Sequence, residues 1–486
     1  MDKIDDQEYD CIIIGGGFSG LISAIELQKR SESNLNILIL ESQSRLGGRS
    51  LTDLNRFPLP IDLGCSLIHG YHEGNPMSQI AKEFNVEVVV TPDQDTLVLG
   101  HDGLLDLNES KSILESLDKC INEVKQNLKE SIPPETESLE DSLRNHITTH
   151  YSNQSNLLSK LIQTIEVGAG IPLNQISSKH FGFHRSFSGS DGLPTGGYQE
   201  IVNQIEKKIN QLGLQLKMNS EVTKLVYDKE NSKVKLEVCN KSDSSSTTQS
   251  YQSKYCISTI PLGVLKTNPP KFEPPLELLT RLSIENTSVG LLNKIVLNYE
   301  YAWWPNSKTI GRYILTSNRN TKLTEKTNSL TDILAMTTFW VDNLAVENCN
   351  QSYPILIIPI GALAAKEIEK FSDEDIIQTL HKYLTQRFQI PDQMLNLPKS
   401  STITRWESNL YSRGATSSPI RIKDDKISST SPLDLILLSR SNWDGHLGFA
   451  GEHTEVDHRG SVAGAILSGK REAKRVIQLL DLTAKH

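Results

Sequence analysis

The sequence has no apolar run that approaches the roughly 20 residues that a membrane-spanning helix needs. Its first residues, MDKIDDQEYDCIIIGGG, are acidic before they become apolar, which is not the pattern of a secretory signal peptide. The six cysteines are scattered without a Cys-x-x-Cys spacing. They therefore favour neither a disulfide framework nor a structural zinc site, and they are typical of a reducing compartment. These absences indicate a soluble globular protein.

Positive charge is also not in excess. The 50 Lys and Arg residues against 59 Asp and Glu residues give a formal net charge of −9. This balance disfavours a nucleic-acid backbone as a partner and is compatible with a cationic ligand. At 486 residues the chain is long enough for two or three domains.

What the sequence does contain begins with YDCIIIGGGFSGLISAIELQKR, which predicts a buried strand, a glycine turn and a helix. We expect Gly15 to allow the tight turn, Gly17 to admit a pyrophosphate, and Gly20 to let the helix pack on the strand. A second predicted strand, NILILE, ends at Glu41, which follows Gly20 by 21 residues (41 − 20) and could accept the ribose hydroxyls. A glycine turn that binds nothing is the alternative. Because strand, helix and acid are all in place, the unit predicts dinucleotide binding.

Downstream of this unit, RLGGRS suggests a loop lying against the same dinucleotide, with the Arg49 guanidinium near phosphate. Apolar spacing predicts further helices near residues 103–165, 197–213, 373–388 and 461–480. It predicts strands within residues 214–228, 233–239, 254–260, 294–300, 354–360 and 447–452, with a Ser/Thr-rich loop at 240–253. The first βαβ unit and the final strand and helix are predicted to belong to one sheet domain, with other material inserted between them.

The stretch GEHTEVDHRGSVAG, residues 451–464, crowds acids and histidines into a few positions. It could be the wall of a cofactor site, or His453 and His458 could be metal ligands. Because no second cluster of ligands accompanies the two histidines, we expect a cofactor wall and no metal.

Six longer motifs follow the glycine-rich start, in order: DLGCSLIHG (62–70), LPTGGYQEIV (193–202), STIPLGVLK (258–266), NKIVLNYEYAWWP (293–305), TRWESNLYSRGATSS (404–418) and LGFAGEHTEVDHRGSVAGAILSGKREAKRVI (447–477). Together with GGGFSG, LE and RLGGR they resemble the flavin-containing amine oxidases, in the polyamine oxidase branch. The matches run from residue 10 to residue 477 and so cover nearly the whole chain.

The resemblance implies an α/β fold: a Rossmann-like FAD-binding domain in three segments, with an inserted α+β substrate-binding domain. We expect FAD segments at 1–85, 193–283 and 421–486, and substrate segments at 86–192 (mostly helical) and 284–420. FAD would be bound non-covalently, because the cysteine that monoamine-oxidase-type members use near RGATSS is absent. The implied reaction moves hydride from the carbon beside a neutral amine to flavin N5. Water then hydrolyses the imine, and dioxygen reoxidises the flavin to give hydrogen peroxide.

Two residues match catalytic positions of that family. Lys294 corresponds to the lysine that holds a water at flavin N5, and His69 to a histidine that can hydrogen-bond the substrate amine and help it stay neutral. A solvated lysine at a strand start and a loop histidine that caps backbone are the plain alternatives.

The implied cofactor contacts are Gly15, Gly17, Gly20, Glu41, Arg49, Gly64, Val222, Trp406, Glu452 and Val462. Glu452 would bond the ribityl chain, Val222 would meet the adenine through its backbone, and Val462 would begin a helix aimed at flavin N1 and O2. Trp406 and Tyr411 would pack near the isoalloxazine, which is compatible with a place in the core.

The chain also departs from the family pattern around the expected substrate tunnel, whose candidates are His458, Tyr411, Leu67 and Leu292. His458 stands where a tyrosine or phenylalanine usually faces the flavin, and Ala463 where a histidine is common. Leu67 replaces a frequent tunnel tryptophan, and Leu292 a tyrosine of plant-type members. These departures bear on substrate identity rather than on fold or cofactor.

The leading hypothesis is a FAD-dependent oxidase of polyamines or acetylated polyamines, with a small cationic amine and dioxygen as its partners and no nucleic acid or membrane. A histone-lysine demethylase is a second hypothesis, disfavoured because the chain starts directly at the flavin strand and its inserts are short. A flavin-binding interaction module without turnover is a third; His458 favours it, whereas Lys294 and His69 speak against it. The C-terminus LTAKH lacks a Ser-Lys-Leu address, so cytoplasm is the default location and the peroxisome the alternative.

Overall fold

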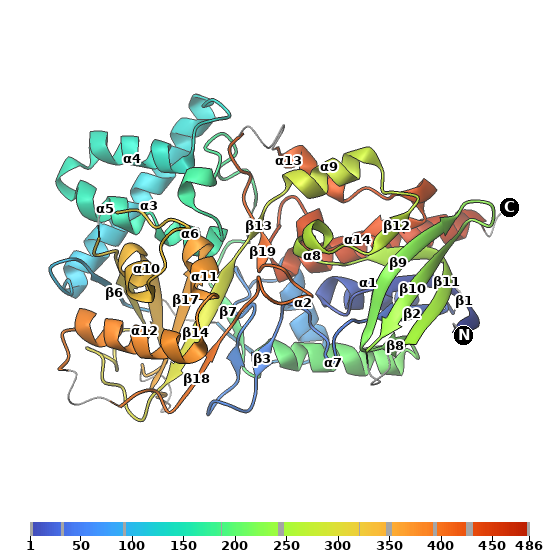
Figure 1. The fold of residues 1–486 in the computed structure, drawn as a ribbon, viewed down its shortest axis with the longest axis horizontal. Helices are drawn as coiled ribbons and strands as arrows, with labels where there is room; N and C mark the ends of the chain where they lie inside the picture. The colour runs from blue at the N-terminus through green and yellow to red at the C-terminus, as the bar shows by residue number, and fades with distance from the viewer. Residues whose placement is uncertain are drawn as a thin grey trace.

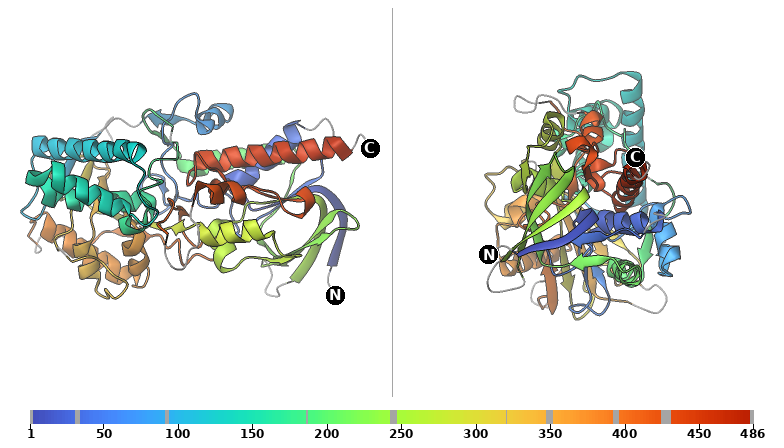
Figure 2. Two further views of the ribbon diagram at one scale, coloured as in Figure 1. Left: turned by 90° about the horizontal axis from the view of Figure 1, so that it is seen from above. Right: turned by 90° about the vertical axis from the view of Figure 1, so that its right-hand side faces the viewer.

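The computed structural model describes residues 3–30, 34–90, 94–185, 187–241, 247–319, 321–346, 352–391, 396–423 and 431–483. Two separate sheets organise the elongated molecule, one in each half (Figure 1). Figure 2 shows α14 running along the half that holds the larger sheet, while helices α3–α5 gather at the opposite end.

The larger sheet has eight strands in the order β12-β9-β10-β11-β1-β2-β8, with β20 pairing the free side of β11 at its carboxyl end. Its strands are β1 (Lys3–Ile14), β2 (Ile37–Leu40), β8 (Gln215–Lys217), β9 (Ser220–Asp228), β10 (Lys233–Asn240), β11 (Thr247–Ser258), β12 (Lys271–Glu273) and β20 (Leu447–Phe449). The five strands β8, β2, β1, β11 and β20 run parallel, whereas β9, β10 and β11 form an antiparallel meander.

Both faces of the parallel strands are buried, which is why these strands read as continuous apolar runs. In β1, Cys11 and Ile13 face a core formed with α1, α2, α7 and α14, and Ile12 and Ile14 face a core formed with α8, α9 and α13. These helices are α1 (Phe18–Arg30), α2 (Pro76–Glu83), α7 (Gly197–Gln211), α8 (Leu262–Thr267), α9 (Leu278–Asn286), α13 (Pro432–Leu438) and α14 (Val462–Thr483).

The smaller sheet has six strands in the order β18-β14-β17-β16-β15-β6. They are β6 (Thr96–Leu99), β14 (Leu292–Asn298), β15 (Arg312–Leu315), β16 (Phe339–Asn343), β17 (Ile355–Gly361) and β18 (Ser400–Ile403). One face packs on α10 (Leu330–Met336), α11 (Ala362–Ile368) and α12 (Asp373–Arg387). The other face meets α3 (Leu107–Glu130), α4 (Leu139–His150), α5 (Ser155–Leu161) and α6 (Thr164–Ala169) at one side and residues 51–63 at the other.

Three two-stranded ribbons complete the described strands: β3 (Thr52–Asp53) with β4 (Ile61–Asp62), β5 (Val88–Val90) with β7 (Gly192–Pro194), and β13 (Val289–Gly290) with β19 (Thr416–Ser417). Within the described ranges, none of the helices is both long and apolar enough to cross a lipid bilayer. The boundaries of the five predicted domain segments stay predictions.

The predicted Ser/Thr-rich loop at 240–253 is partly wrong, because β11 begins at Thr247. The polar residues there pair with β10 through backbone hydrogen bonds in a register that sets Val238 opposite Gln249. Tyr251 is 2% exposed and packs into the core. Strand pairing therefore overrides the polar composition, which carries no signal of its own for a half-buried strand inside a sheet.

Candidate functional site

The carboxyl ends of the parallel strands bring four of the predicted segments together. The glycine turn follows β1, Glu41 follows β2, Thr259 follows β11, and the stretch beginning at Gly451 follows β20. In open α/β sheets ligands bind at such strand ends, where the chain crosses from one side of the sheet to the other. This end of the larger sheet is the candidate cofactor site.

The glycine turn is open where a cofactor would have to approach. Gly15 has φ +107°, and a Cβ there would lie 2.3 Å from Thr259 Oγ1. A Cβ at Gly20 would lie 2.0 Å from the Gly15 carbonyl oxygen, so only glycine lets α1 pack so closely on the turn. At Gly17, by contrast, no atom lies within 4 Å of an added Cβ. The backbone is therefore free to approach a phosphate at Gly17.

Glu41 lies directly behind this turn and is 4% exposed. Its Oε2 accepts the Gly16 N–H at 2.6 Å, and its Oε1 accepts the Gln43 N–H at 2.8 Å. Burial raises the pKa of this carboxyl above its usual value, against the effect of these hydrogen bonds. The second glycine pair lies against the first, since Gly47 N–H donates to Gly16 O at 2.9 Å and Gly47 is bridged to Gly17.

The partly exposed Arg49 and the buried Glu452 form an ion pair, with Nη1 2.7 Å from Oε1. The carboxylate also accepts from Ser417 Oγ at 2.5 Å and from Gly460 N–H at 2.8 Å. Burial alone would raise the pKa of Glu452, but the Arg49 charge, His453 and the Ser417 hydrogen bond outweigh it and hold the pKa at about 2. Two predicted cofactor residues thus meet and tie the first part of the chain to the last.

The other cofactor candidates surround this pair or the neighbouring strands. A Cβ at Gly64 would lie 1.9 Å from the Arg49 carbonyl oxygen, so this close approach requires glycine. Helix α14 begins at Val462, as predicted, and its Ser468 Oγ accepts the Gly451 N–H at 2.9 Å. Val222 lies on β9 and is 8% exposed.

Lys294, on β14 of the smaller sheet, reaches across to the loop that follows β4. Its ammonium donates to Asp62 O at 2.8 Å, to Gly64 O at 2.7 Å and to Ser66 Oγ at 3.0 Å, so all three protons have acceptors. Burial lowers the pKa of Lys294, and the charge of Asp62 opposes the shift. Burial likewise raises the pKa of Asp62 to about 6. Lys294 is therefore a partly buried lysine that links the smaller sheet to the loop after β4.

A second charged pair lies on the same face of the smaller sheet. Asp342 of β16 accepts from Arg312 Nε at 2.6 Å, and the Arg312 guanidinium lies 5.2 Å from the centre of the Trp340 ring. Burial raises the pKa of Asp342, against the charges of Arg312 and Lys294. Because side chains alternate along a strand, the opposite face is left to apolar residues such as Ile295.

His69 lies on the loop that holds Lys294, and Asp191 accompanies it. His69 Nδ1 is 3.0 Å from Asp191 Oδ2, and the Gly70 N–H donates to Asp191 Oδ1 at 3.0 Å. The flanking backbone is paired as well, because Ile68 and Gly192 exchange two hydrogen bonds of 2.8 and 3.0 Å. The histidine ring itself is 70% exposed.

His458 is stacked on Phe187, with ring centroids 4.2 Å apart and planes 9° apart. The His72 ring meets Phe187 edge-on at 5.7 Å. Residues 187–192, called here the 187–192 loop, therefore contact both candidate histidines of the substrate side, His458 through Phe187 and His69 through Asp191. Sequence analysis missed these two residues. The available signal was FSGSDG, a short polar run with one aromatic and one acid directly before the LPTGGY motif.

The remaining candidates divide between two places. Leu292 begins β14 two residues before Lys294, and the Leu67 carbonyl accepts the Tyr198 hydroxyl at 3.2 Å. Trp406 is 6% exposed within the core of the smaller sheet. The Tyr411 hydroxyl accepts from Lys241 at 2.7 Å, and Lys241 in turn pairs with Glu221, the neighbour of Val222. The structure thus groups Tyr411 with the β9 candidates and not with His69 and His458.

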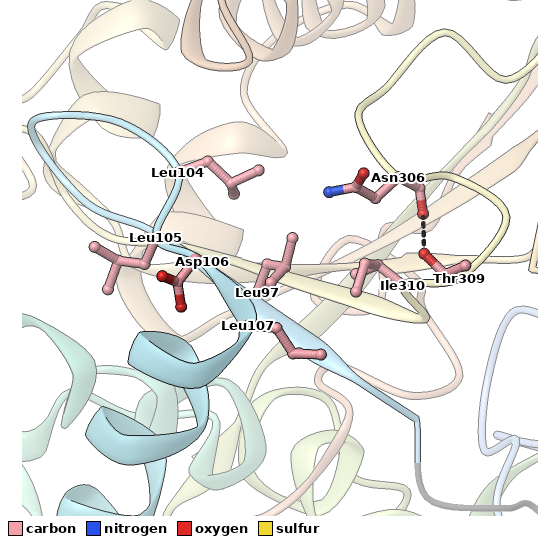
Figure 3. Close-up of a pocket in the computed structure, with 8 residues that line it drawn as sticks. All are labelled: Leu97, Leu104, Leu105, Asp106, Leu107, Asn306, Thr309 and Ile310. Carbon is pink, nitrogen blue, oxygen red and sulfur yellow. Dashed lines mark hydrogen bonds between the residues drawn. The ribbon is translucent and has the colours of Figure 1, made fainter.

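A separate pocket of about 390 Å³ lies beside β6, at the edge of the smaller sheet (Figure 3). It is lined by Leu97, Leu104, Leu105, Asp106, Leu107, Asn306, Thr309 and Ile310, none of which is a predicted site residue. Its one carboxylate, Asp106, caps α3 by accepting the Glu109 N–H at 2.9 Å. Among the residues that the structure describes, no three His, Cys, Asp or Glu side chains gather so as to hold a metal ion.

Comparisons with known proteins agree on one family. The family described as flavin containing amine oxidoreductase matches residues 18–477. Probable polyamine oxidase 4 of Arabidopsis thaliana is 27% identical, over 96% of this chain and 87% of its own length. Lysine-specific histone demethylase 1 homolog 3 of the same plant is 26% identical over 99% of this chain but only 31% of its own length.

A solved structure of putrescine oxidase, a double mutant with redesigned cofactor binding, matches with a TM-score of 0.72 and 16% identity. The match covers 98% of this chain and all of that one, and it supports the predicted α/β fold. The open backbone at Gly17 and the buried Glu41 beside it fit the adenosine diphosphate part of a flavin dinucleotide. The chain belongs to the flavin-containing amine oxidoreductase family and uses FAD as its cofactor.

Proposed function

We propose that this amine oxidase acts on polyamines or acetylated polyamines and uses dioxygen to reoxidise its flavin. One observation carries the proposal. The two predicted catalytic residues, 225 positions apart (294 − 69), meet on one loop: Lys294 binds it at Asp62, Gly64 and Ser66, and His69 follows three residues later. The similarity to polyamine oxidases supports the substrate class.

When bound, FAD supplies the two-electron acceptor for oxidation of the amine carbon. The protein's own groups bind and orient the substrate. His69 offers a hydrogen bond to the amine, and the stacked rings of His458 and Phe187 form an aromatic wall for an alkyl chain. The Lys294 ammonium binds the loop that holds Gly64, a predicted cofactor contact, and a positive charge there would favour a negatively charged reduced cofactor.

A histone-lysine demethylase is a second candidate, because a relative of that name is 26% identical over 99% of this chain. A flavin-binding module without turnover is the third candidate. It predicts a yellow protein whose flavin no amine reduces.

For the location, we propose the cytoplasm.

Anaerobic mixing of the yellow protein with spermine, spermidine, N-acetylspermine and a monoamine, one at a time, tests the proposal through the visible absorbance of the flavin. We expect bleaching by at least one polyamine or acetylated polyamine and not by the monoamine. Bleaching by the monoamine alone would indicate a monoamine oxidase instead of a polyamine oxidase. A flavin that none of these amines bleaches would favour the flavin-binding module without turnover.

A further inference from the structure

We infer that Asp191 is a positioning residue that makes His69 the base for the substrate ammonium, an inference that rests on the proposed function. The carboxylate bridges two donors of one loop. Oδ1 accepts the Gly70 N–H at 3.0 Å, and Oδ2 lies 3.0 Å from His69 Nδ1. Because a carboxylate only accepts hydrogen bonds, Nδ1 must carry the ring proton, and the lone pair of the neutral imidazole is left on Nε2.

The surrounding backbone fixes this pair on both sides. Tyr71 N–H donates to Ser190 O at 2.8 Å, next to the bonds between Ile68 and Gly192. The Asn75 side chain donates to the His69 carbonyl at 2.9 Å. Asp191 therefore lies between two backbone-paired residues, Ser190 and Gly192, and His69 directly follows the paired Ile68, so the two segments hold the side chains facing each other.

The geometry gives His69 a task that a hydrogen bond alone would not. A polyamine arrives as an ammonium, whereas only the neutral amine has the lone pair that assists loss of hydride from the neighbouring carbon. The N–H bond of the ammonium breaks, its electron pair stays on the amine nitrogen, and the proton forms a new bond to Nε2. Asp191 stabilises the resulting imidazolium through Nδ1–H. Since the ring is 70% exposed, the proton can then pass to water.

Asparagine at position 191 should reverse the tautomer. Its single oxygen can satisfy the Gly70 N–H, as Oδ1 does now, but its NH₂ group would then face Nδ1. Nδ1 must in that case accept, which places the ring proton on Nε2. The imidazole would present a donor to the substrate, so it could no longer take the ammonium proton.

The test is anaerobic flavin reduction at subsaturating amine, by rapid mixing at pH 7 and pH 10, with the amine that bleaches the wild type. We expect Asp191→Asn to slow reduction about 100-fold at pH 7, the lower end of what general-base catalysis contributes. At pH 10 we expect a loss of about threefold, because alkylamines with a pKa of about 10.4 are then partly neutral without a base. Asp53→Asn is the matched control, since Asp53 also holds a loop through backbone N–H groups, those of Asn55 and Arg56.

A purely structural Asp191 would lower the rate by the same factor at both pH values, and that result would overturn the inference. In a His69→Gln background, Asp191→Asn should slow flavin reduction little further at pH 7. If the two substitutions instead multiply their effects on the rate, that result would also contradict the inference. A wild type that no amine bleaches would defeat the proposed function itself. A bleached wild type with a pH-independent Asp191→Asn deficit would defeat only the role of Asp191.

Discussion

The strand ends of the larger sheet and the loop that Lys294 binds differ in how far their titratable side chains are buried. At the strand ends, backbone groups and glycines form the surface, and the titratable groups Glu41 and Glu452 are buried and hydrogen-bonded in place. On the substrate side, His69 and His458 keep exposed or half-exposed rings, each supported by one residue of the 187–192 loop. The two carboxylates of the cofactor side are buried and hydrogen-bonded, whereas the histidine rings of the substrate side are exposed or partly exposed to water.

The difference teaches where mutations should act. Removing a charge from the cofactor side leaves another charge buried without its counter-ion, and the loss should appear as stability. Removing a group from the substrate side exposes little that was buried, and the loss should appear as rate.

The largest effect is expected for Arg49→Met. Glu452 would remain buried without its cation, which costs about 3–5 kcal/mol when one partner of a buried pair is removed. Urea unfolding and flavin content after purification measure it. Arg30→Met is the matched control, because Arg30 forms an exposed pair with Glu26 on α1. Equal stability of the two variants would contradict the comparison, and adding Glu452→Gln to Arg49→Met should restore part of the loss.

Acid should weaken the same pair in a defined range. The pKa of Glu452 is about 2 when folded against 4.5 ordinarily, so its ionisation favours folding by about 3 kcal/mol above pH 4.5. That contribution is lost as the pH falls through 2, with about 2 kcal/mol gone by pH 3. Urea unfolding at pH 6, 5, 4 and 3 should therefore show the stability difference between wild type and Glu452→Gln shrinking.

His453 complicates this comparison, because burial lowers its pKa to about 4. Its protonation as the pH falls therefore also lowers the free energy of unfolding. Both proteins should therefore carry His453→Gln during the measurement. A difference between them that stays constant from pH 6 to pH 3 would show that Glu452 is not held ionised by its surroundings.

The cofactor side was largely predictable from the sequence, and the substrate side was not. The turn at Gly15 to Gly20 is visible in the sequence because its three spaced glycines lie within six residues, although the Cβ clash at Gly15 involves the distant Thr259. His69 and Asp191 lie 122 residues apart in the sequence, and neither a histidine nor an aspartate predicts the position of the other. Pairings of this kind depend on how two loops meet after folding, which no local pattern records.

Next in size we place Lys294→Met, which should slow flavin reoxidation by dioxygen about tenfold more than flavin reduction, equivalent to about 1.4 kcal/mol of barrier. The reason is that the fixed cation favours the charge that develops as the reduced flavin reacts. Rapid mixing measures the two half-reactions separately. Lys266→Met is the matched control: Lys266 also donates to two backbone carbonyls, those of Ile284 and Glu285, but it is an exposed residue of α8, in the half that holds the larger sheet. Equal slowing of both half-reactions in Lys294→Met would remove the assigned role.

The smallest effect is expected at His458. His458→Phe keeps a ring to stack on Phe187, so stability should change little, whereas His458→Ala should lose about 1 kcal/mol, as is usual for an aromatic pair. If the stacked pair limits the width of the substrate path, His458→Phe should keep the wild-type order of preference among amines. His458→Ala should then admit bulkier N-substituted amines, measured as the ratio of kcat/KM for a bulky and a slender amine. Identical ratios in all three proteins would mean that the Phe187 ring alone forms this wall, because a ring that shapes specificity cannot be removed without changing what passes it.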